Sequence, residues 1–405
     1  MKKEDYHENG FNGDYSIVPG TQNRYYFDWA ASAIPDPVSS EILIPFGNPS
    51  SPHFEGRAAR EALENARSRC ASVMSVPPET VFFTSGGTES NCIPLYSHLA
   101  RKCSGRIIAS AGEHSSVTEN LKTLERQGKQ TGEIPIDSSG RVTPELLTKT
   151  LEKYDDVRFA AIMAVNNEIG TVNNINTLRD IIKNRTDSPQ KGGAPIYLHC
   201  DIVQAMGKIP LDIPGWDIDS ASVSAHKIGG PRGIGLLYLR KPLETLYSGG
   251  GQEKNIRPGT ENIAGAIALA ACLENHALPE KFTTEYAAAR SRWRKLLTAL
   301  KNIDRCRIIP GNRDIDDDGF SPYIVQAAFR DIPGEVMTRA LDDLGFAVST
   351  GSACSSSSPE RPVLTSMGIE DNVSLEGIRI SQGWSTTEEE IDLLLAAINE
   401  VLKFL

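Results

Sequence analysis

The sequence has little that would place the protein in a membrane or on a nucleic acid. No stretch approaches the roughly 18 consecutive apolar residues of a membrane-spanning helix, and residues 1–23 are polar, without the apolar core of an export signal. Basic residues are in deficit, because 42 Lys and Arg against 52 Asp and Glu give a formal net charge of −10. A nucleic-acid-binding protein would carry an excess of basic charge. We therefore expect neither class, and we interpret residues 1–23 as an N-terminal extension.

Paired cysteines are absent as well. The seven cysteines are scattered, odd in number and include no C-x-x-C pair, so the sequence indicates neither a disulfide framework nor a zinc site. A reducing cytoplasm is the simplest compartment for such a chain. Six of the seven are expected to be small buried hydrophobic residues. The exception is Cys354 in "STGSACSSSS" (349–358), where no neighbour is bulky enough to bury it.

The sequence also lacks internal repeats and long low-complexity segments, and alternates strands with helices instead. A chain of 405 residues is too long for one small core, so we expect two domains. From about residue 54, short β-branched runs alternate with helical periodicity, the pattern of strand–helix units on a parallel sheet. Strands are predicted at 81–85, 106–110, 157–165, 196–201, 220–226 and 233–239, and helices at 54–74, 144–154, 175–184 and 261–277. The last third predicts a smaller α+β unit that ends in an amphipathic helix over 385–405.

Three segments carry residue types that together suggest a cofactor. Lys227 follows a predicted strand and precedes "GGPRG", and is either a solvated side chain or a Schiff-base lysine. Asp201 ends another strand and is either a helix N-cap or the partner of a pyridinium nitrogen. "FFTSGGTESNCIPL" (82–95) runs from a strand through a Gly-Gly turn into a helix, which directs free N–H groups at an anion, although the same turn forms without a ligand. Together they suggest pyridoxal phosphate (PLP).

These segments belong to a longer series of motifs, which are "GNPSSPHFEGRAAREA", "FTSGGTES", "EHSSV", "VNNEIGTV", "HCDIVQAMGK", "SAHKIGGPRGIG", "IRPGTEN", "STGSAC" and "IRISQGWSTTEEE". In this order and spacing the chain resembles the cysteine desulfurases of the class V aminotransferase family, the NifS-like and IscS-like enzymes, from residue 25 to the terminal helix. The resemblance implies an α/β fold of PLP-dependent transferase type I, similar to aspartate aminotransferase. Its large PLP-binding domain, with a mostly parallel seven-stranded sheet, would span 46–276, and its small α+β domain 24–45 and 277–405.

The resemblance also implies roles for individual residues. Contacts to the cofactor ring are implied for Lys227 (Schiff base, then the Cα proton), Asp201 (pyridine nitrogen), Gln204 (phenolic oxygen), His114 (stacking and proton shuttling) and Asn167 (ring face and substrate). Contacts to the phosphate are implied for Gly87, Thr88, Ser224, His226 and, from a neighbouring subunit, Thr260. Contacts to the substrate carboxylate are implied for Asn48 and Arg379. A homodimer with composite active sites follows from the role of Thr260.

The resemblance gives Cys354 a catalytic role. Its thiolate would take the sulfur of L-cysteine, leaving L-alanine and an enzyme persulfide, and the small polar residues around it would let it reach both the pocket and an acceptor. The acceptor would be a protein, either an Fe–S scaffold or a sulfur carrier. The pathway would be Fe–S cluster assembly or another sulfur-containing biosynthesis.

Rival interpretations remain at this stage. The chain could be a selenocysteine lyase or another class V PLP lyase or aminotransferase, or a non-catalytic relative that serves as a dimeric interaction partner. Six positions depart from the family pattern, namely Asn91 and Cys92, which replace an Asp-Asn pair, and Ile202, Val203, Gly229 and Trp384. None of them removes a proposed catalytic group.

Overall fold

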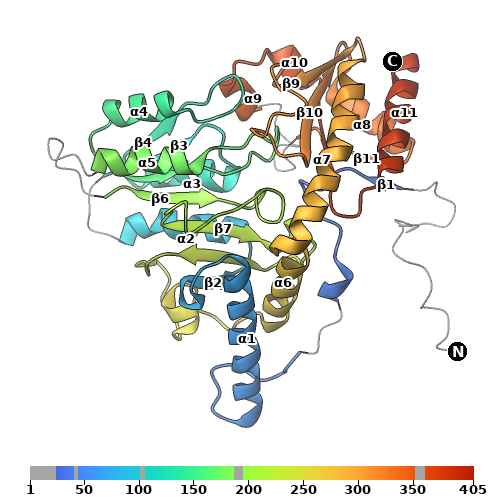
Figure 1. Cartoon of the computed structure of the whole chain (residues 1–405). Coiled ribbons are helices and arrows are strands. Elements are labelled where there is room, and N and C mark those ends of the chain that lie inside the picture. The colour runs from blue at the N-terminus through green and yellow to red at the C-terminus, as the bar shows by residue number, and fades with distance from the viewer. Residues whose placement is uncertain (1–23, 41–43, 101–104, 187–194, 352–360) are drawn as a thin grey trace, which may run out of the picture.

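The computed structural model describes residues 24–40, 44–100, 105–186, 195–351 and 361–405 (Figure 1). Its main sheet has seven strands, in the order β2 (Val81–Thr84), β8 (Gly235–Leu239), β7 (Ser220–Ser224), β6 (Tyr197–Asp201), β5 (Val157–Ala161), β3 (Arg106–Ser110) and β4 (Thr131–Ile134). Strands β3 to β7 pair in parallel, and β8 is antiparallel to both β7 and β2. The predicted mostly parallel seven-stranded sheet is therefore confirmed.

Helices cover both faces of this sheet. Successive strand residues point to opposite faces, and both faces are apolar: Phe83 and Ile108 pack in one cluster, Phe82 and Ile107 in clusters on the other side. The helices of the first face are α1 (Phe54–Val73), α4 (Pro144–Lys153), α5 (Ile175–Thr186) and α6 (Ile263–His276). Those of the second are α2 (Gly87–Ala100) and α3 (Ser115–Arg126). Burial on both faces explains why the strands appear in the sequence as continuous apolar runs.

A second, smaller unit has its own apolar core, which includes Trp293, Phe329 and Ile398. Its strands are β12 (Gly377–Ser381), β10 (Ile324–Phe329) and β9 (Cys306–Ile309), all antiparallel, with a separate parallel pair of β1 (Tyr25–Tyr26) and β11 (Phe346–Ala347). The helices of this core are α7 (Pro279–Lys301), α8 (Gly334–Asp343) and α11 (Glu388–Phe404). Two short helices, α9 (Pro362–Ser366) and α10 (Asp371–Leu375), place apolar side chains in the core of the large sheet. Figure 1 shows the blue β1 beside these orange and red elements. None of the helices described is long and apolar enough to cross a membrane.

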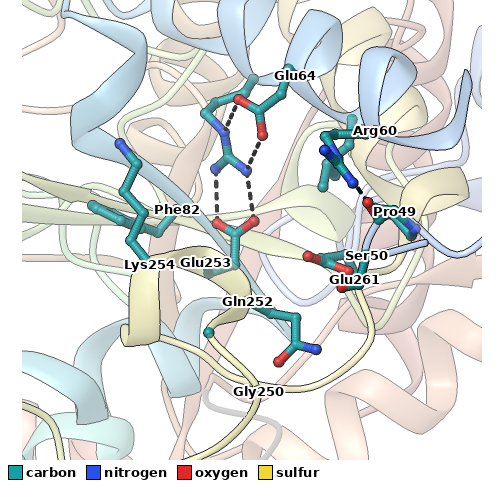
Figure 2. A pocket seen from close by; sticks show the side chains of 13 residues that line it. Pro49, Ser50, Arg60, Glu64, Phe82, Gly250, Gln252, Glu253, Lys254 and Glu261 are labelled. Carbon is teal, nitrogen blue, oxygen red and sulfur yellow. Dashed lines mark hydrogen bonds and ion pairs between the residues drawn. The ribbon is translucent and has the colours of Figure 1, made fainter. Parts of the chain in front are cut away.

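The outer edge of β2 is covered by a buried ion pair rather than by another strand. Arg67 of α1 and Glu253 form two hydrogen bonds of 2.8 and 2.7 Å. Arg67 also donates to the carbonyl of Val81 (2.8 Å), and Glu253 accepts from the N–H of Phe83 (2.7 Å). The pair thus satisfies backbone groups that an edge strand would leave unpaired. Figure 2 shows it beside a cavity of about 290 Å³ between α1 and residues 250–254.

An ion triad, with Asp36 and His276 buried and Glu285 partly buried, joins the N-terminal segment to α6 and α7. The Nε2 atom of His276 lies 2.7 Å from Asp36 Oδ2, and its Nδ1 atom lies 3.3 Å from Glu285 Oε2. The ring also stacks on Trp384, with 5.3 Å between centroids. Burial alone would lower the pKa of His276, but its hydrogen bonds to Asp36 and Glu285 outweigh that effect and raise the pKa.

We expect the substitution His276→Gln to destabilise the protein by about 3 kcal/mol near pH 6, because it leaves the buried carboxylate of Asp36 and the partly buried carboxylate of Glu285 without their cation. The charged His276 ring makes its full contribution to the free energy of unfolding at pH values below the pKa of histidine in the unfolded chain, about 6.5. It is lost as pH rises through the raised folded pKa. Chemical denaturation of wild type and variant should therefore give a larger difference in unfolding free energy at pH 6 than at pH 9. Equal differences at the two pH values would contradict this account.

Candidate active site

A cavity of about 310 Å³ lies where the parallel strands end, the usual position for ligands in open α/β sheets. Asp201 is the last residue of β6, and Ser224 is the last residue of β7. Ten of the residues singled out in the sequence line this cavity: Gly87, Thr88, His114, Asn167, Asp201, Gln204, Ser224, His226, Lys227 and Arg379. They come from both the large and the smaller unit, because Arg379 belongs to β12.

The amine of Lys227 is held by the N-terminal segment. Lys227 ends a short 3-10 helix that follows β7 directly. Its Nζ atom donates hydrogen bonds to the carbonyls of Ala30 (2.7 Å) and Ala31 (2.8 Å). The N–H of Ala33 donates to the carbonyl of His226 (2.8 Å), which fastens the two segments together. The amine therefore has a defined position in the cavity wall, as a covalent attachment point requires.

Gln204 is oriented by another lysine, Lys208, which is buried. Its Nε2 atom donates to the carbonyl of Ala30 (2.8 Å), and its Oε1 atom accepts from Lys208 Nζ (2.9 Å). Burial, together with the charges of Lys227 and Arg379, lowers the pKa of Lys208 to about 7. The amide is thus fixed with its donor nitrogen on the side of Lys227.

Asp201 is 4% exposed, and both of its carboxylate oxygens accept hydrogen bonds. Oδ1 accepts from the N–H of Val203 (2.9 Å), and Oδ2 accepts from Asn91 Nδ2 (2.8 Å). Two donors stabilise the ionised form of a buried carboxyl group. An anion in this position suits a protonated ring nitrogen.

The N-terminus of α2 forms a cradle for an anion. The first N–H groups of a helix have no intrahelical acceptor, and the helix dipole favours negative charge there. A Cβ atom at Gly87 would lie 2.9 Å from Val203 Cγ2 and 3.4 Å from Ser224 Cβ, so a side chain at this position would fill the space. Gly86 has φ of +148°, which side chains rarely tolerate. A neighbouring cavity of about 410 Å³ shares Gly87 and Ser224 with the first.

The two histidines of the cavity are neutral at physiological pH. Burial lowers the pKa of His226 to about 4, with a further contribution from the charge of Lys227. Burial also lowers the pKa of His114, although Asp201 opposes the shift. The N–H of Ser116 donates to His114 Nδ1 (3.1 Å), so the proton of the neutral ring is on Nε2.

Arg379 is 2% exposed and is oriented by two oxygen acceptors. Its Nη1 atom donates to the carbonyl of Asn167 (2.9 Å), and its Nη2 atom donates to Asp28 Oδ1 (2.8 Å). Its Nε atom is buried without a hydrogen-bond partner within the described ranges. Buried donors are rarely left unpaired, so a donor of this kind at a cavity suits an oxygen of a ligand.

Three predicted site residues do not line this cavity. Asn48 is exposed, and its Oδ1 atom accepts from the N–H of Ser50 (2.9 Å), in the loop that borders the cavity of Figure 2. Thr260 is exposed, three residues after Arg257, whose Nε atom lies 3.3 Å from Glu89 Oε1 in the first turn of α2. Cys354 lies outside the described residues.

Sequence reasoning also missed residues that hold the site together. These are Asp28, Asn91, Ser116, Met163 and Lys208. Asn91 and Lys208 each lie four residues after a predicted ligand contact, Gly87 and Gln204 respectively. For Asn91, on a helix, that spacing means one turn on the same face. This spacing from Gly87 was the one signal in the sequence that could have indicated Asn91.

Comparison with known proteins agrees with this geometry. The model of the family described as aminotransferase class-V matches residues 24–394. Cysteine desulfurase IscS of Dictyoglomus turgidum is 35% identical over 398 residues, 94% of this chain and 95% of the relative. A solved structure described as a NifS-like protein has a TM-score of 0.84 and 33% identity, and covers 94% of this chain and 100% of its own. A structure described as SspA in complex with cysteine has a TM-score of 0.71 and 26% identity, over 88% of this chain and 98% of its own.

Proposed function

The chain belongs to the aminotransferase class-V family, and from this premise we propose that it is a PLP-dependent cysteine desulfurase. It converts L-cysteine to L-alanine and passes the sulfur, through an enzyme persulfide, to an acceptor for Fe–S cluster or other sulfur-containing biosynthesis. The observation that carries this proposal is the convergence of Lys227, Asp201 and Arg379 on one cavity. An amine, a buried carboxylate and a guanidinium are the groups needed for an aldehyde cofactor and an amino acid substrate.

The residues of the cavity suit PLP. Lys227 would bind the aldehyde carbon, and Asp201 would pair with the ring nitrogen. Gln204, whose donor nitrogen is on the Lys227 side, would bond the phenolic oxygen. The cradle at Gly87 and Ser224 would take the phosphate, because it combines free helix N–H groups with a hydroxyl. Bound PLP would supply an electron sink that stabilises negative charge on the Cα atom of the substrate.

The side chains of the site have separate tasks. Arg379, whose Nε donor has no partner in the described part of the chain, binds the substrate carboxylate and so fixes the orientation of the amino acid. Lys227 Nζ, once freed from the carbonyls of Ala30 and Ala31, removes the Cα proton and later returns one. His114 is neutral, so its Nε2–H donates a hydrogen bond rather than adding a positive charge.

Cys354 is the sulfur acceptor in this proposal. Its thiolate attacks the sulfur of L-cysteine, the Cβ–S bond breaks, and the electron pair of that bond stays with the substrate carbon. A proton taken up at Cβ completes L-alanine, and the enzyme retains a persulfide, so L-cysteine and thiol become L-alanine and persulfide with all atoms balanced. Transfer of the outer sulfur of the persulfide to a protein acceptor regenerates the Cys354 thiol.

We propose that Thr260 contacts the phosphate across the interface of a homodimer. Thr260 lies on the surface of one protomer, in a loop that the Arg257–Glu89 ion pair fastens to the start of α2. In the dimer it would reach the phosphate of the partner. Asn48, which is exposed in the protomer, would meet the substrate carboxylate in the same assembly.

The proposal is tested by incubating the PLP-loaded protein with L-cysteine and a dithiol reductant, and measuring alanine and sulfide in the same sample. We expect the two products in equal amounts. L-Selenocysteine, assayed in parallel, separates the alternatives, because a selenocysteine lyase would turn it over and leave L-cysteine unchanged. Alanine without sulfide would indicate another class V reaction. If neither alanine nor sulfide is formed, the proposal is overturned.

A further inference from the structure

Asn91 connects three polar groups of the active site in one buried network. It is 1% exposed and lies one turn into α2. Its Nδ2 atom donates to Asp201 Oδ2 (2.8 Å) and to Ser116 Oγ (2.8 Å). Its Oδ1 atom is 2.8 Å from His199 Nε2. No other side chain described in the cavity bonds both to Asp201 and to a residue that contacts His114.

The direction of every hydrogen bond follows from Asp201. A carboxylate only accepts, so the amide nitrogen of Asn91 must face Asp201 and the amide oxygen must face His199. That oxygen also only accepts, so His199 carries its proton on Nε2. His199 Nδ1, 2.7 Å from Ser220 Oγ, is then the acceptor of the hydroxyl. Burial lowers the pKa of His199 to about 4, which keeps the ring neutral.

A second branch runs from Asn91 to the cavity. Because Ser116 Oγ accepts from Asn91, its own hydroxyl hydrogen is available to His114 Nδ1 at 2.9 Å. The N–H of Ser116 donates to the same nitrogen. Both contacts make Nδ1 an acceptor, and both leave the proton of His114 on Nε2.

We propose that Asn91 is a positioning residue, which aims the Asp201 carboxylate and fixes the protons of the neutral His199 and His114 rings on Nε2. The role of Asn91 in the network does not depend on the proposed function. Only its consequence does, namely that the ring nitrogen of PLP meets an ionised partner. Asn91 touches neither substrate nor reacting atoms in this role. An amide is suited to the task because it donates to one neighbour and accepts from another without taking a charge.

The other titratable groups around the network are Glu113, Cys200 and Lys227. Burial, and then the charge of Asp201, raises the pKa of Glu113 well above its usual value. Burial likewise raises the pKa of Cys200. Asp201 acts on the charge of both histidines and Lys227 on that of His114. Among the described residues, Asn91 is the one side chain that bonds to Asp201.

The substitution Asn91→Asp tests this role at nearly constant volume. It places a second carboxylate about 2.8 Å from Asp201, so the two must share a proton, and it gives His199 an anionic neighbour. We expect the pKa of His199 to rise by more than about one unit. Nitrogen NMR of histidine-labelled full-length protein, with His199→Gln to assign the signal, would show His199 charging between pH 5 and 8 instead of below.

Two holoenzyme measurements test the consequence for the cofactor. The affinity for PLP should fall about tenfold or more, because a hydrogen bond to a buried charge is disturbed. The pH midpoint of the visible absorbance of the cofactor should rise, because a partly protonated Asp201 no longer keeps the ring nitrogen charged. The matched control is Asn173→Asp: Asn173 is 5% exposed and bonds to Val142 N and Met163 O, outside the network.

The outcomes are distinct. Altered His199 signals and a shifted midpoint in Asn91→Asp, but not in Asn173→Asp, support the proposal. Wild-type signals and midpoint in Asn91→Asp overturn it. Should that variant not fold, Asn91→Ala replaces it, and it should give His199 as a mixture of tautomers, whereas a single Nε2–H form would overturn the proposal. If the wild-type protein binds no PLP, the proposed function is wrong. The NMR signal of His199 would still decide the role of Asn91 in that case.

Discussion

The substitution Lys227→Ala is expected to give a folded protein that releases alanine from L-cysteine about a thousandfold more slowly or not at all. Two losses combine: PLP has no covalent anchor, and no amine remains to move the Cα proton. The carbonyls of Ala30 and Ala31, which accept from Nζ at 2.7 and 2.8 Å, lose their donor. Alanine release is measured together with the absorbance of the protein after borohydride reduction. Reduction should fix the cofactor to wild type and not to the variant.

A matched control is available for this experiment. Lys301 is exposed, but its Nζ atom also donates a part-buried hydrogen bond to a backbone carbonyl, that of Arg313, at 2.7 Å. It lies at the end of α7, away from the cavity. Lys301→Ala should retain cofactor and turnover. A Lys227→Ala variant that kept both would show that the covalent attachment is elsewhere.

The substitution Cys354→Ala is expected to abolish sulfide release, by about a thousandfold or more, while the protein keeps its cofactor. The residues proposed to hold PLP are unchanged, but the sulfur of L-cysteine has no thiolate to accept it. The protein should still bind L-cysteine, with a change in the cofactor absorbance that does not proceed to alanine. Mass spectrometry after incubation with L-cysteine should find a mass increase of one sulfur in wild type only.

Cys306 provides the control for this substitution. It is partly buried in β9, and burial raises the pKa of its thiol to about 12, so it carries almost no thiolate at neutral pH. Cys306→Ala should leave both products unchanged. Normal sulfide release from Cys354→Ala would instead favour the rival lyases and aminotransferases that need no thiol.

The strands of the large sheet could be predicted because most of them are buried on both faces. Uninterrupted runs such as "RIIAS" and "SASVS" then stand out from the helices between them. β4 could not be found in the same way, since Thr131–Ile134 lies at the edge, contains a glycine and is only partly buried. The predicted strand over 157–165 was too long, because the regular part ends at Ala161 and Met163 already belongs to the cavity wall.

The cavity residues could be predicted where chemistry and position coincide. Asp201 and Lys227 are reactive types at strand ends, and both signals are local. Asn91 and Lys208 act through partners that are distant in sequence or unremarkable in type, since Asn91 meets Asp201 across 110 positions. The pairing of Asp28 with Arg379 spans 351 positions. No periodicity or motif indicates such a contact, so it can be recognised only in the folded structure.

The stretch from Asp28 to Ala31 has a consequence for how the enzyme responds to its substrate. Asp28 bonds to the guanidinium that would receive the carboxylate, and the carbonyls two and three residues later bond to the amine that must be set free. Because these bonds belong to one short stretch of backbone, we expect a ligand that draws the guanidinium away from Asp28 to weaken the hydrogen bonds to the amine, and release of the amine to weaken the bond to Asp28 in return. Thermodynamic reciprocity makes the two effects equal in free energy. Four residues of backbone thereby couple recognition of one end of the amino acid to reactivity at the other.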